Sequence, residues 1–320
     1  MSAIDQITAP ILPLMAKFRA TYDGALSSEN PLLERVVKHV QASSGKQMRP
    51  MLVLLSASLL GEATEGSFHA AAAVELLHVA SLMHDDVVDE SALRRGKPSV
   101  AAQFNNKVAV LGGDYFLSTA LSESVSTRRV EVMEVIARLG QVLSDGELLQ
   151  LDCALRQQFS EDLYFSVIRC KTAALFEACA RLGAMTSTAS TAQDAGRLAR
   201  FGELLGLCFQ IKDDLLDYEP SDKVGKPTGN DIREGKFTLP LIHVYEQADE
   251  AKRNEMLRLL EEADVERLQE MARRDGGIRY ATQCLERLKA EAEACLSVYP
   301  DSPVKSSLLL YLDYVSCRTF

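Results

Sequence analysis

The chain has 320 residues, of which 47% are hydrophobic and 25% are charged, and its formal net charge is −10. This length and composition are typical of a globular protein with a full apolar core. The acidic balance excludes non-specific binding to nucleic acid, which needs an excess of basic side chains. No run of about 18 apolar residues occurs, so we expect no membrane-spanning helix.

The cysteines and the first residues indicate the compartment. The seven cysteines are widely spaced and form no CxxC pair. This pattern predicts free thiols in a reducing environment, neither a disulfide framework nor a zinc site. The opening sequence MSAIDQITAP lacks the basic start and apolar core of a signal peptide. We therefore expect a cytoplasmic protein.

Proline placement predicts the course of the helices. Residues 51–60 and 71–83 are apolar almost all round, which is typical of helices at the centre of a bundle. Residues 99–219 and 241–299 contain no proline, are rich in good helix formers and repeat apolar residues every three or four positions. We expect an all-α fold and, because no linker or repeat divides the chain, a single domain over residues 1–320.

Two acidic clusters share one spacing, in which two adjacent aspartates are followed by two apolar residues and a third aspartate. The first comes directly after the second apolar segment and consists of Asp85, Asp86 and Asp89. The second lies in FQIKDDLLDY and consists of Asp213, Asp214 and Asp217. At roughly 100° per residue, each cluster crowds its carboxylates on one helix face. Carboxylates this close repel one another, and a hard divalent cation would compensate their charge. Mg²⁺ binds one or two carboxylates together with substrate phosphate oxygens.

Basic residues surround both clusters. Arg94 and Arg95 follow the first cluster, and a long loop over residues 218–240 follows the second and is rich in lysine. In an acidic chain, this arrangement predicts a polyanion bound between metal ions and cations. His78 lies two helical turns before Asp85 on the same face; from its position it is either a phosphate donor or a core histidine. The chain contains no GxxxxGK[ST], GxGxxG, HExxH or GxSxG motif.

These motifs resemble the trans (E-type) isoprenyl diphosphate synthases, the polyprenyl synthetase family. The resemblance extends from about residue 30 to residue 320 and rests on six segments in order. They are GKQMRP (45–50), ELLHVASLMHDDVVDESALRRGKPS (75–99), GGDYF (112–116), RCKTAALF (169–176), FQIKDDLLDY (209–218) and GKPTGNDIREGKFTLPL (225–241). The resemblance implies a bundle of mostly antiparallel helices around a deep central cavity, and a homodimer.

The resemblance also assigns roles to single residues. Asp85, Asp89 and Asp213 match the main Mg²⁺ ligands, with Asp86, Asp214 and Asp217 in support, for three ions in all when diphosphate is bound. The isopentenyl diphosphate pocket is matched by Lys46, Arg49, His78 and Arg95. Contacts to the allylic diphosphate are matched by Arg94, Lys171, Lys226 and Lys236. Thr172 and Gln210 match residues beside the reacting carbons, so that Lys171, Thr172, Gln210 and Arg94 are the expected catalytic residues.

The implied activity is a Mg²⁺-dependent condensation of isopentenyl diphosphate with geranyl or farnesyl diphosphate, by ionisation, condensation and elimination. Ala80 and Ser81 are small where bulky aromatic residues stop growth early in this family. The resemblance therefore implies an all-trans product of about forty carbons, as in octaprenyl-type synthases, with about twenty to twenty-five carbons as the alternative. A long product would also imply at most transient contact with a membrane during its release.

Two further interpretations stay open at this point. A class I terpene cyclase shares the helical bundle and a first aspartate cluster, although the second cluster, GKQMRP and the Arg94-Arg95 pair are not typical of it. A non-catalytic subunit of a heteromeric synthase is the other, although such subunits typically lose aspartate motifs that are intact here.

Overall fold

The computed structural model describes residues 2–43, 45–219 and 228–318. Within these ranges the regular secondary structure is helical apart from a two-stranded hairpin and one isolated bridge between Ala63 and Ser187, so the predicted all-α fold is confirmed. The chain divides into two compact units. Unit 1 consists of Met1–Gly140, Leu175–Ala199 and Tyr299–Leu310, and unit 2 consists of Gln141–Ala174, Arg200–Val298 and Tyr311–Phe320. The single domain over residues 1–320 stays a prediction.

Unit 1 contains the N-terminal helices. They are α1 (Ala3–Thr8), the 3-10 helix η1 (Ala9–Ile11), α2 (Leu12–Ala25), α3 (Pro31–Ala42), α4 (Met48–Leu60), α5 (Glu65–Val88), α6 (Val100–Gln103) and α7 (Asn106–Ser126). The unit also holds nearly all of α10 (Ala174–Met185). Three further helices contribute residues to both units: α8 (Val130–Leu155), α11 (Ala192–Leu216) and α18 (Pro303–Cys317).

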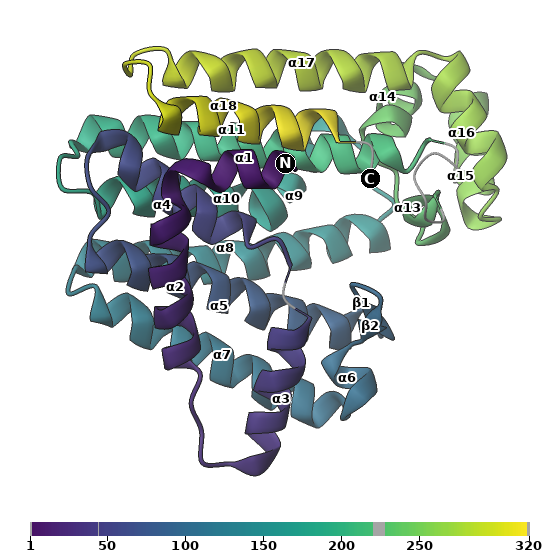
Figure 1. Ribbon diagram of the computed structural model, residues 1–320. Helices are drawn as coiled ribbons and strands as arrows, with labels where there is room; N and C mark the ends of the chain where they lie inside the picture. The colour runs from purple at the N-terminus through teal and green to yellow at the C-terminus, as the bar shows by residue number, and fades with distance from the viewer. Residues whose placement is uncertain (1, 44, 220–227, 319–320) are drawn as a thin grey trace. The chain divides into compact units, whose positions relative to one another are not determined.

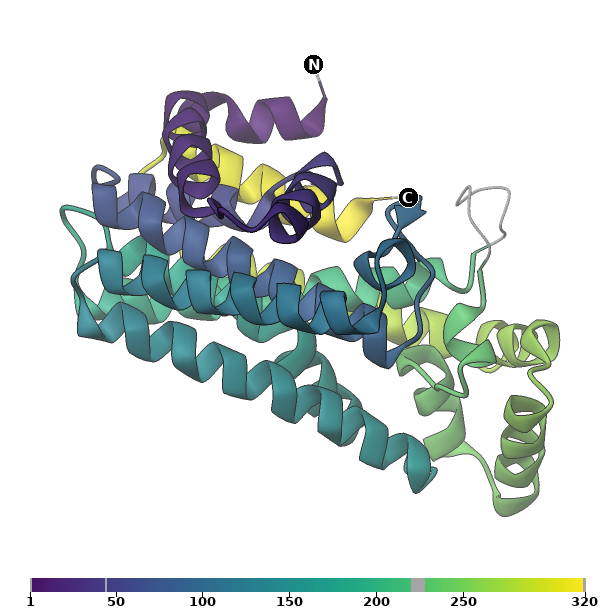
Figure 2. The ribbon, with the colours of Figure 1, turned by 90° about the horizontal axis from the view of Figure 1, so that it is seen from below.

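The centre of unit 1 is α5, which packs along α7 (Figures 1 and 2). Alanines 70–73 on α5 are fully buried. On α7, a Cβ atom at Gly112 would lie 2.6 Å from the Met83 side chain, so the missing side chain lets the two helices approach closely. By length and composition α5 could cross a membrane, but 72% of its most apolar window is buried inside the protein.

A short hairpin follows α5 and presents the basic pair. Strand β1 (Leu93–Arg94) pairs with β2 (Lys97–Pro98) in antiparallel register. The two residues of the turn, Arg95 and Gly96, have φ of 53° and 75°. Positive φ at both central residues is the signature of a type I′ turn, whose twist matches that of the flanking strands. The side chains of Arg94 and Arg95 are thereby placed beside the end of α5.

Unit 2 contains the C-terminal helices. They are α9 (Glu161–Ile168), the π-helix η2 (Arg169–Ala173), α13 (Asn230–Arg233), α14 (Leu239–Gln247), α15 (Glu250–Glu261), α16 (Val265–Arg274) and α17 (Gly277–Leu296). The π-helix lies directly against α8. A Cβ atom at Gly146 of α8 would lie 2.7 Å from the Cys170 Cβ and 3.1 Å from the Lys171 backbone nitrogen. The glycine is therefore what admits the wider turn of η2.

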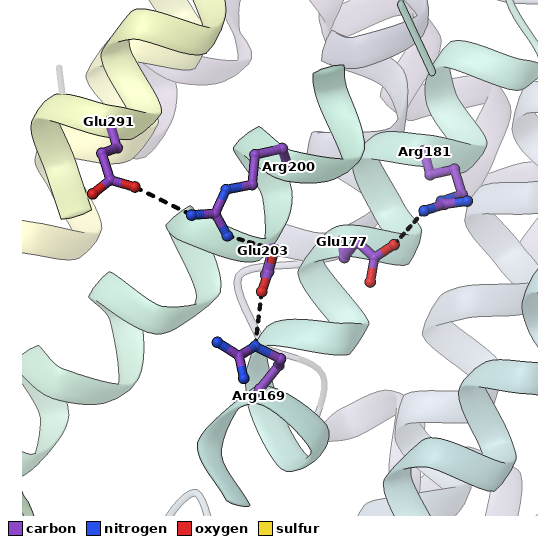
Figure 3. A network of polar contacts seen from close by, with 6 residues as sticks. All are labelled: Arg169, Glu177, Arg181, Arg200, Glu203 and Glu291. Carbon is purple, nitrogen blue, oxygen red and sulfur yellow. Dashed lines mark hydrogen bonds and ion pairs between the residues drawn. The ribbon is translucent and has the colours of Figure 1, made fainter. Parts of the chain in front are cut away.

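A charged network ties η2 to two other helices of unit 2 (Figure 3). Arg169 Nε donates to Glu203 Oε1 at 2.9 Å, and Arg200 donates to Glu203 Oε2 at 2.7 Å and to Glu291 Oε2 at 3.1 Å. Burial raises the pKa of Glu203, but its hydrogen bonds from Arg200 and Arg169 outweigh that effect, so the pKa is lowered. The start of η2 is thus fixed to α11 and, through Arg200, to α17.

Candidate functional site

Unit 1 contains an open cavity of about 700 Å³ with polar and apolar lining residues. Its wall is formed by α2, α3, α5, the hairpin and the segment that precedes α4. The charged and polar lining residues include Arg19, Tyr22, Gln47, Glu75, Asp86, Arg94 and Arg95. Three of the residues predicted from the sequence, Asp86, Arg94 and Arg95, therefore face one cavity.

The guanidinium of Arg95 is held by the segment before α4. Its Nη1 donates to the Ser43 carbonyl oxygen at 3.0 Å. A Cβ atom at Gly45 would lie 2.6 Å from the Arg95 Cζ, so this position has room for the guanidinium only as glycine. In GKQMRP, the glycine therefore has a packing role.

The first aspartate cluster occupies the C-terminal end of α5. Asp86 is 3% exposed and accepts hydrogen bonds from two nitrogens of Arg94, Nε at 2.9 Å and Nη2. Asp85 is half-buried and Asp89, at the helix C-cap, is exposed. The negative end of a helix dipole disfavours carboxylates, so a cluster at this end is a place where cations are stabilised.

Two buried residues of α5 lie near these arginines. Burial lowers the pKa of His78 well below its usual value, and Arg49, Arg95 and Arg94 lower it further. His78 is therefore neutral near pH 7 and can donate one hydrogen bond. Glu75 lines the cavity at 7% exposure, and its Oε2 has no hydrogen-bond partner among the described residues. Burial raises the pKa of Glu75 in spite of Arg49 and Arg95.

Unit 2 has its own cavity, of about 270 Å³. Four predicted residues line it together with one aspartate of the second cluster: Lys171, Thr172, Gln210, Lys236 and Asp214. Apolar and aromatic side chains complete the wall, among them Phe159 and Phe237, whose ring centroids are 4.6 Å apart. The cavity thus combines polar groups that can orient a ligand with an apolar lining.

Lys171 lies on the π-helix and is held from α8. Its Nζ forms an ion pair with Glu147 at 2.7 Å and a hydrogen bond with Gln150 Oε1 at 2.5 Å. π-Helical turns are frequent at functional sites because they redirect side chains. Here the wider turn and the contacts from α8 together place the lysine at the cavity.

The three aspartates of the second cluster have different partners. Asp213, 40% exposed, forms an ion pair of 3.0 Å with Arg318. The carboxylate of Asp217 instead accepts from the backbone nitrogens of Gly229, Asn230 and Asp231 at 2.8 to 3.1 Å. It therefore caps the N-terminus of α13, where a helix dipole favours negative charge.

Asp214 is the buried member of the cluster. Burial raises its pKa to about 8, and the charges of Asp231 and Asp213 act in the same direction. Asp231 lies at the same cavity, and burial followed by the charge of Asp217 raises its pKa to about 6. Burial and neighbouring negative charges therefore disfavour the ionised form of both carboxyl groups. A cation bound nearby would favour the ionised form.

The donor set fits Mg²⁺, because both clusters offer carboxylate oxygens and this ion needs only one or two of them. Among the described residues, no group of three or more His, Cys, Asp or Glu side chains gathers as a metal site. The ion count and the ligand set therefore stay predictions. Lys226, which was expected to contact the allylic diphosphate, lies outside the described residues.

Several predicted residues lie in unit 1 without lining its cavity: Lys46, Arg49, His78, Asp85 and Asp89. The predicted chain-length residues are also in this unit on α5, where Ala80 is 2% exposed and Ser81 is half-buried. Sequence reasoning did not single out Glu75, Glu147, Tyr164, Asp231 or Arg318. Only Asp231 had a usable signal, since it lies in the same lysine-rich loop as Lys236.

Comparisons with known proteins give the family of the chain. The sequence profile of the family described as polyprenyl synthetase matches residues 30–274. Octaprenyl diphosphate synthase from Escherichia coli is 34% identical over 316 residues, which cover 97% of this chain and 96% of that protein.

Two solved structures extend the similarity to the fold. A decaprenyl diphosphate synthase from Rhodobacter capsulatus superposes with a TM-score of 0.93 at 36% identity, covering 99% of both chains. A geranylgeranyl pyrophosphate synthase from Bacteroides thetaiotaomicron superposes with a TM-score of 0.85 at 40% identity, covering 99% of this chain and 100% of that one. The aspartate clusters, the basic residues around them and the helical fold therefore have one explanation: the chain belongs to the polyprenyl synthetase family.

Proposed function

We propose that this protein is a Mg²⁺-dependent trans-prenyltransferase that condenses isopentenyl diphosphate with geranyl or farnesyl diphosphate. The observation that carries this proposal is the pairing of carboxylates and cations at two cavities. In unit 1, Asp86 lies with Arg94 and Arg95, and in unit 2, Asp214 lies with Lys171 and Lys236. Each pairing suits a diphosphate group that is bound through metal ions and basic side chains.

The basic residues of unit 1 bind isopentenyl diphosphate in this proposal. Arg95 is pre-positioned by Ser43 and Gly45, and a fixed guanidinium loses little freedom on binding phosphate oxygens. His78 is buried and neutral, which suits a donor to a phosphate oxygen. Lys46 and Arg49 complete the set.

The allylic diphosphate is bound by Arg94, Lys171, Lys226 and Lys236 and by the aspartate clusters. Asp85, Asp89 and Asp213 would be the main ligands of three Mg²⁺ ions, with Asp86, Asp214 and Asp217 in support. When bound, Mg²⁺ supplies positive charge that stabilises the diphosphate as a leaving group. Arg94 and Lys171 act on the same developing charge, and each is held by an acidic partner, Asp86 for Arg94 and Glu147 for Lys171.

The reaction then has three parts. The bond between the allylic carbon and the diphosphate oxygen breaks, and its electron pair leaves with the diphosphate. The double bond of isopentenyl diphosphate attacks the allylic cation to form the new carbon–carbon bond. A proton is finally lost to the released diphosphate. Thr172 and Gln210 lie beside the reacting carbons, at the wall of the cavity in unit 2.

We infer a long product of about forty carbons. The small side chains of Ala80 and Ser81 support this length, as does the similarity to an octaprenyl diphosphate synthase. The similarity to a geranylgeranyl pyrophosphate synthase supports the shorter alternative of about twenty to twenty-five carbons.

The test is to incubate the purified protein with Mg²⁺, radiolabelled isopentenyl diphosphate and farnesyl diphosphate, and to size the dephosphorylated products. A ladder that ends near forty carbons supports the proposal in full. A ladder that ends near twenty to twenty-five carbons keeps the elongation reaction and refutes the length. No incorporation with any allylic primer refutes the enzyme, and a cyclic hydrocarbon would identify a terpene cyclase.

We propose a homodimer in the cytoplasm, with at most transient membrane contact during product release. Four large apolar side chains of α7 support the dimer by their exposure: Val110 (41%), Leu111 (68%), Leu121 (43%) and Val125 (53%). Sedimentation analysis of wild type and Leu111→Asp tests it. We expect a dimer that is weakened in the variant, and a wild-type monomer at micromolar concentration would refute it.

A further inference from the structure

Three hydrogen bonds link four side chains at the cavity of unit 2. Tyr164 Oη donates to Asp214 Oδ2 at 2.6 Å, and Gln210 Nε2 donates to Asp214 Oδ1 at 2.8 Å. Thr172 Oγ1 donates to Gln210 Oε1 at 2.7 Å. The residues come from α9, η2 and α11, and all four line the cavity. A single chain of bonds therefore runs from the phenol of Tyr164 to the hydroxyl of Thr172.

The hydrogen bonds at Asp214 give the direction of this chain. Its Oδ2 accepts from Tyr164 Oη and its Oδ1 accepts from Gln210 Nε2. The end of Gln210 that faces Asp214 is then the amide nitrogen, and its carbonyl oxygen faces Thr172. Thr172 must in turn donate its proton to Gln210. Its oxygen lone pairs are left for a ligand in the cavity.

Asp214 is too buried to bind a metal ion directly in this inference, so its support of the metal site is indirect. It is 4% exposed, and each of its oxygens already accepts one bond. Tyr164, at 8% exposure, holds one of these oxygens. By contrast, Asp213 is half-buried as a residue, 40% of its side chain is exposed, and it forms an ion pair with Arg318. Asp213 and Asp214, although adjacent in one cluster, therefore have different roles.

We propose that Tyr164 and Asp214 are positioning residues that turn the Thr172 oxygen toward the reacting allylic carbon. The inference rests on the proposed function, because it assigns a task within that reaction. As the carbon–oxygen bond of the allylic substrate breaks, positive charge develops on carbon, and fixed lone pairs stabilise it without reorganisation. If the hydrogen-bond chain ran in the opposite direction, the hydroxyl proton of Thr172 would point at the cation and oppose its formation.

The test compares Tyr164→Phe, Thr172→Val and the double variant in steady-state kinetics with farnesyl diphosphate. Tyr164→Phe removes one donor and keeps the ring. We expect kcat to fall about tenfold with KM unchanged, because the bound ground state carries no charge on carbon. In the Thr172→Val background, the same change should have almost no further effect, because the chain acts through the Thr172 oxygen.

A second measurement separates positioning from metal binding. Mn²⁺ binding in the presence of inorganic diphosphate is followed by electron paramagnetic resonance for wild type, Tyr164→Phe and Asp214→Asn. We expect unchanged Mn²⁺ affinity in both variants. A loss of affinity would make Asp214 a metal ligand and overturn the inference.

Tyr280→Phe is the matched control. Its hydroxyl also donates to a carboxylate of unit 2, Glu161, at 2.6 and 2.8 Å, but it does not line the cavity. It should leave kcat unchanged. Equal losses of kcat from Tyr164→Phe in the wild-type and Thr172→Val backgrounds would overturn the inference, as would an unchanged kcat in an active wild-type enzyme. An inactive wild type would instead refute the proposed function.

Discussion

The position of the Arg95 guanidinium depends on Gly45, which has no side chain. The guanidinium occupies the space that a Cβ at Gly45 would fill, 2.6 Å from Cζ. We expect Gly45→Ala to displace the flexible end of the arginine at little cost in stability, and to raise the KM for isopentenyl diphosphate about tenfold. Gly24→Ala on α2 is the control, because its Cβ would meet nothing within 4 Å. Equal KM values for the two variants would contradict this role of Gly45.

His78 should make the protein sensitive to acid. Its folded pKa lies well below the usual value because of burial and three arginines, so the unfolded chain binds a proton first as pH falls. The free energy of unfolding should therefore decrease below about pH 6.5, by up to about 1.4 kcal/mol per pH unit from this group. Urea unfolding of wild type and His78→Gln between pH 7.5 and 5 measures the difference. A constant difference across this range would contradict the assignment.

Single residues differ in how far the sequence predicts them. The aspartate clusters were predictable, because their spacing is local and places three carboxylates on one helix face. The different partners of Asp213, Asp214 and Asp217 were not, because these partners lie elsewhere in the sequence. Tyr164 reaches Asp214 across 50 residues and Arg318 reaches Asp213 across more. Contacts of this kind depend on tertiary packing, which no periodicity reports.

At the scale of elements, the contact between α8 and η2 decides where Lys171 lies. Gly146→Ala would place a Cβ 2.7 Å from Cys170 and should cost about 1–3 kcal/mol by overpacking. Gly140→Ala on the same helix meets nothing within 4 Å and should stabilise by up to about 1 kcal/mol through helix propensity. Thermal unfolding measures both changes. If both variants change the Tm in the same direction, η2 accommodates the added methyl group and the predicted overpacking is wrong.

The long helices could be predicted because their signal is local in the sequence. The π-helix η2 could not, because it has no local signal. Proline-free stretches with apolar residues every three or four positions report helix as a local property, and the structure confirms helices within residues 99–219 and 241–299. A π-turn in RCKTA has no such signal. It depends on Gly146 of α8, which is far away in the sequence and close in space.

At the scale of the whole molecule, ligand binding should appear as stability. A ligand that binds only the folded state at about 100 times its Kd adds about 2.7 kcal/mol. We expect Mg²⁺ with inorganic diphosphate to raise the Tm by several degrees, and either component alone to raise it less, because each cluster pairs carboxylates with cations. A chelator should reverse the shift. Equal shifts with diphosphate alone and with both components would contradict metal-mediated binding.

The capping of α13 by Asp217 has a consequence for the tolerance of substitutions. A cap needs an oxygen acceptor and no charge, so asparagine or serine can still accept from Gly229 and Asn230 and loses only the bond from the Asp231 backbone nitrogen to Oδ2. Asp214 needs an acceptor at both oxygens, and Asp213 needs an exposed charge. In a library that varies all three positions and is selected for activity, the three members of one motif should therefore accept three different sets of amino acids.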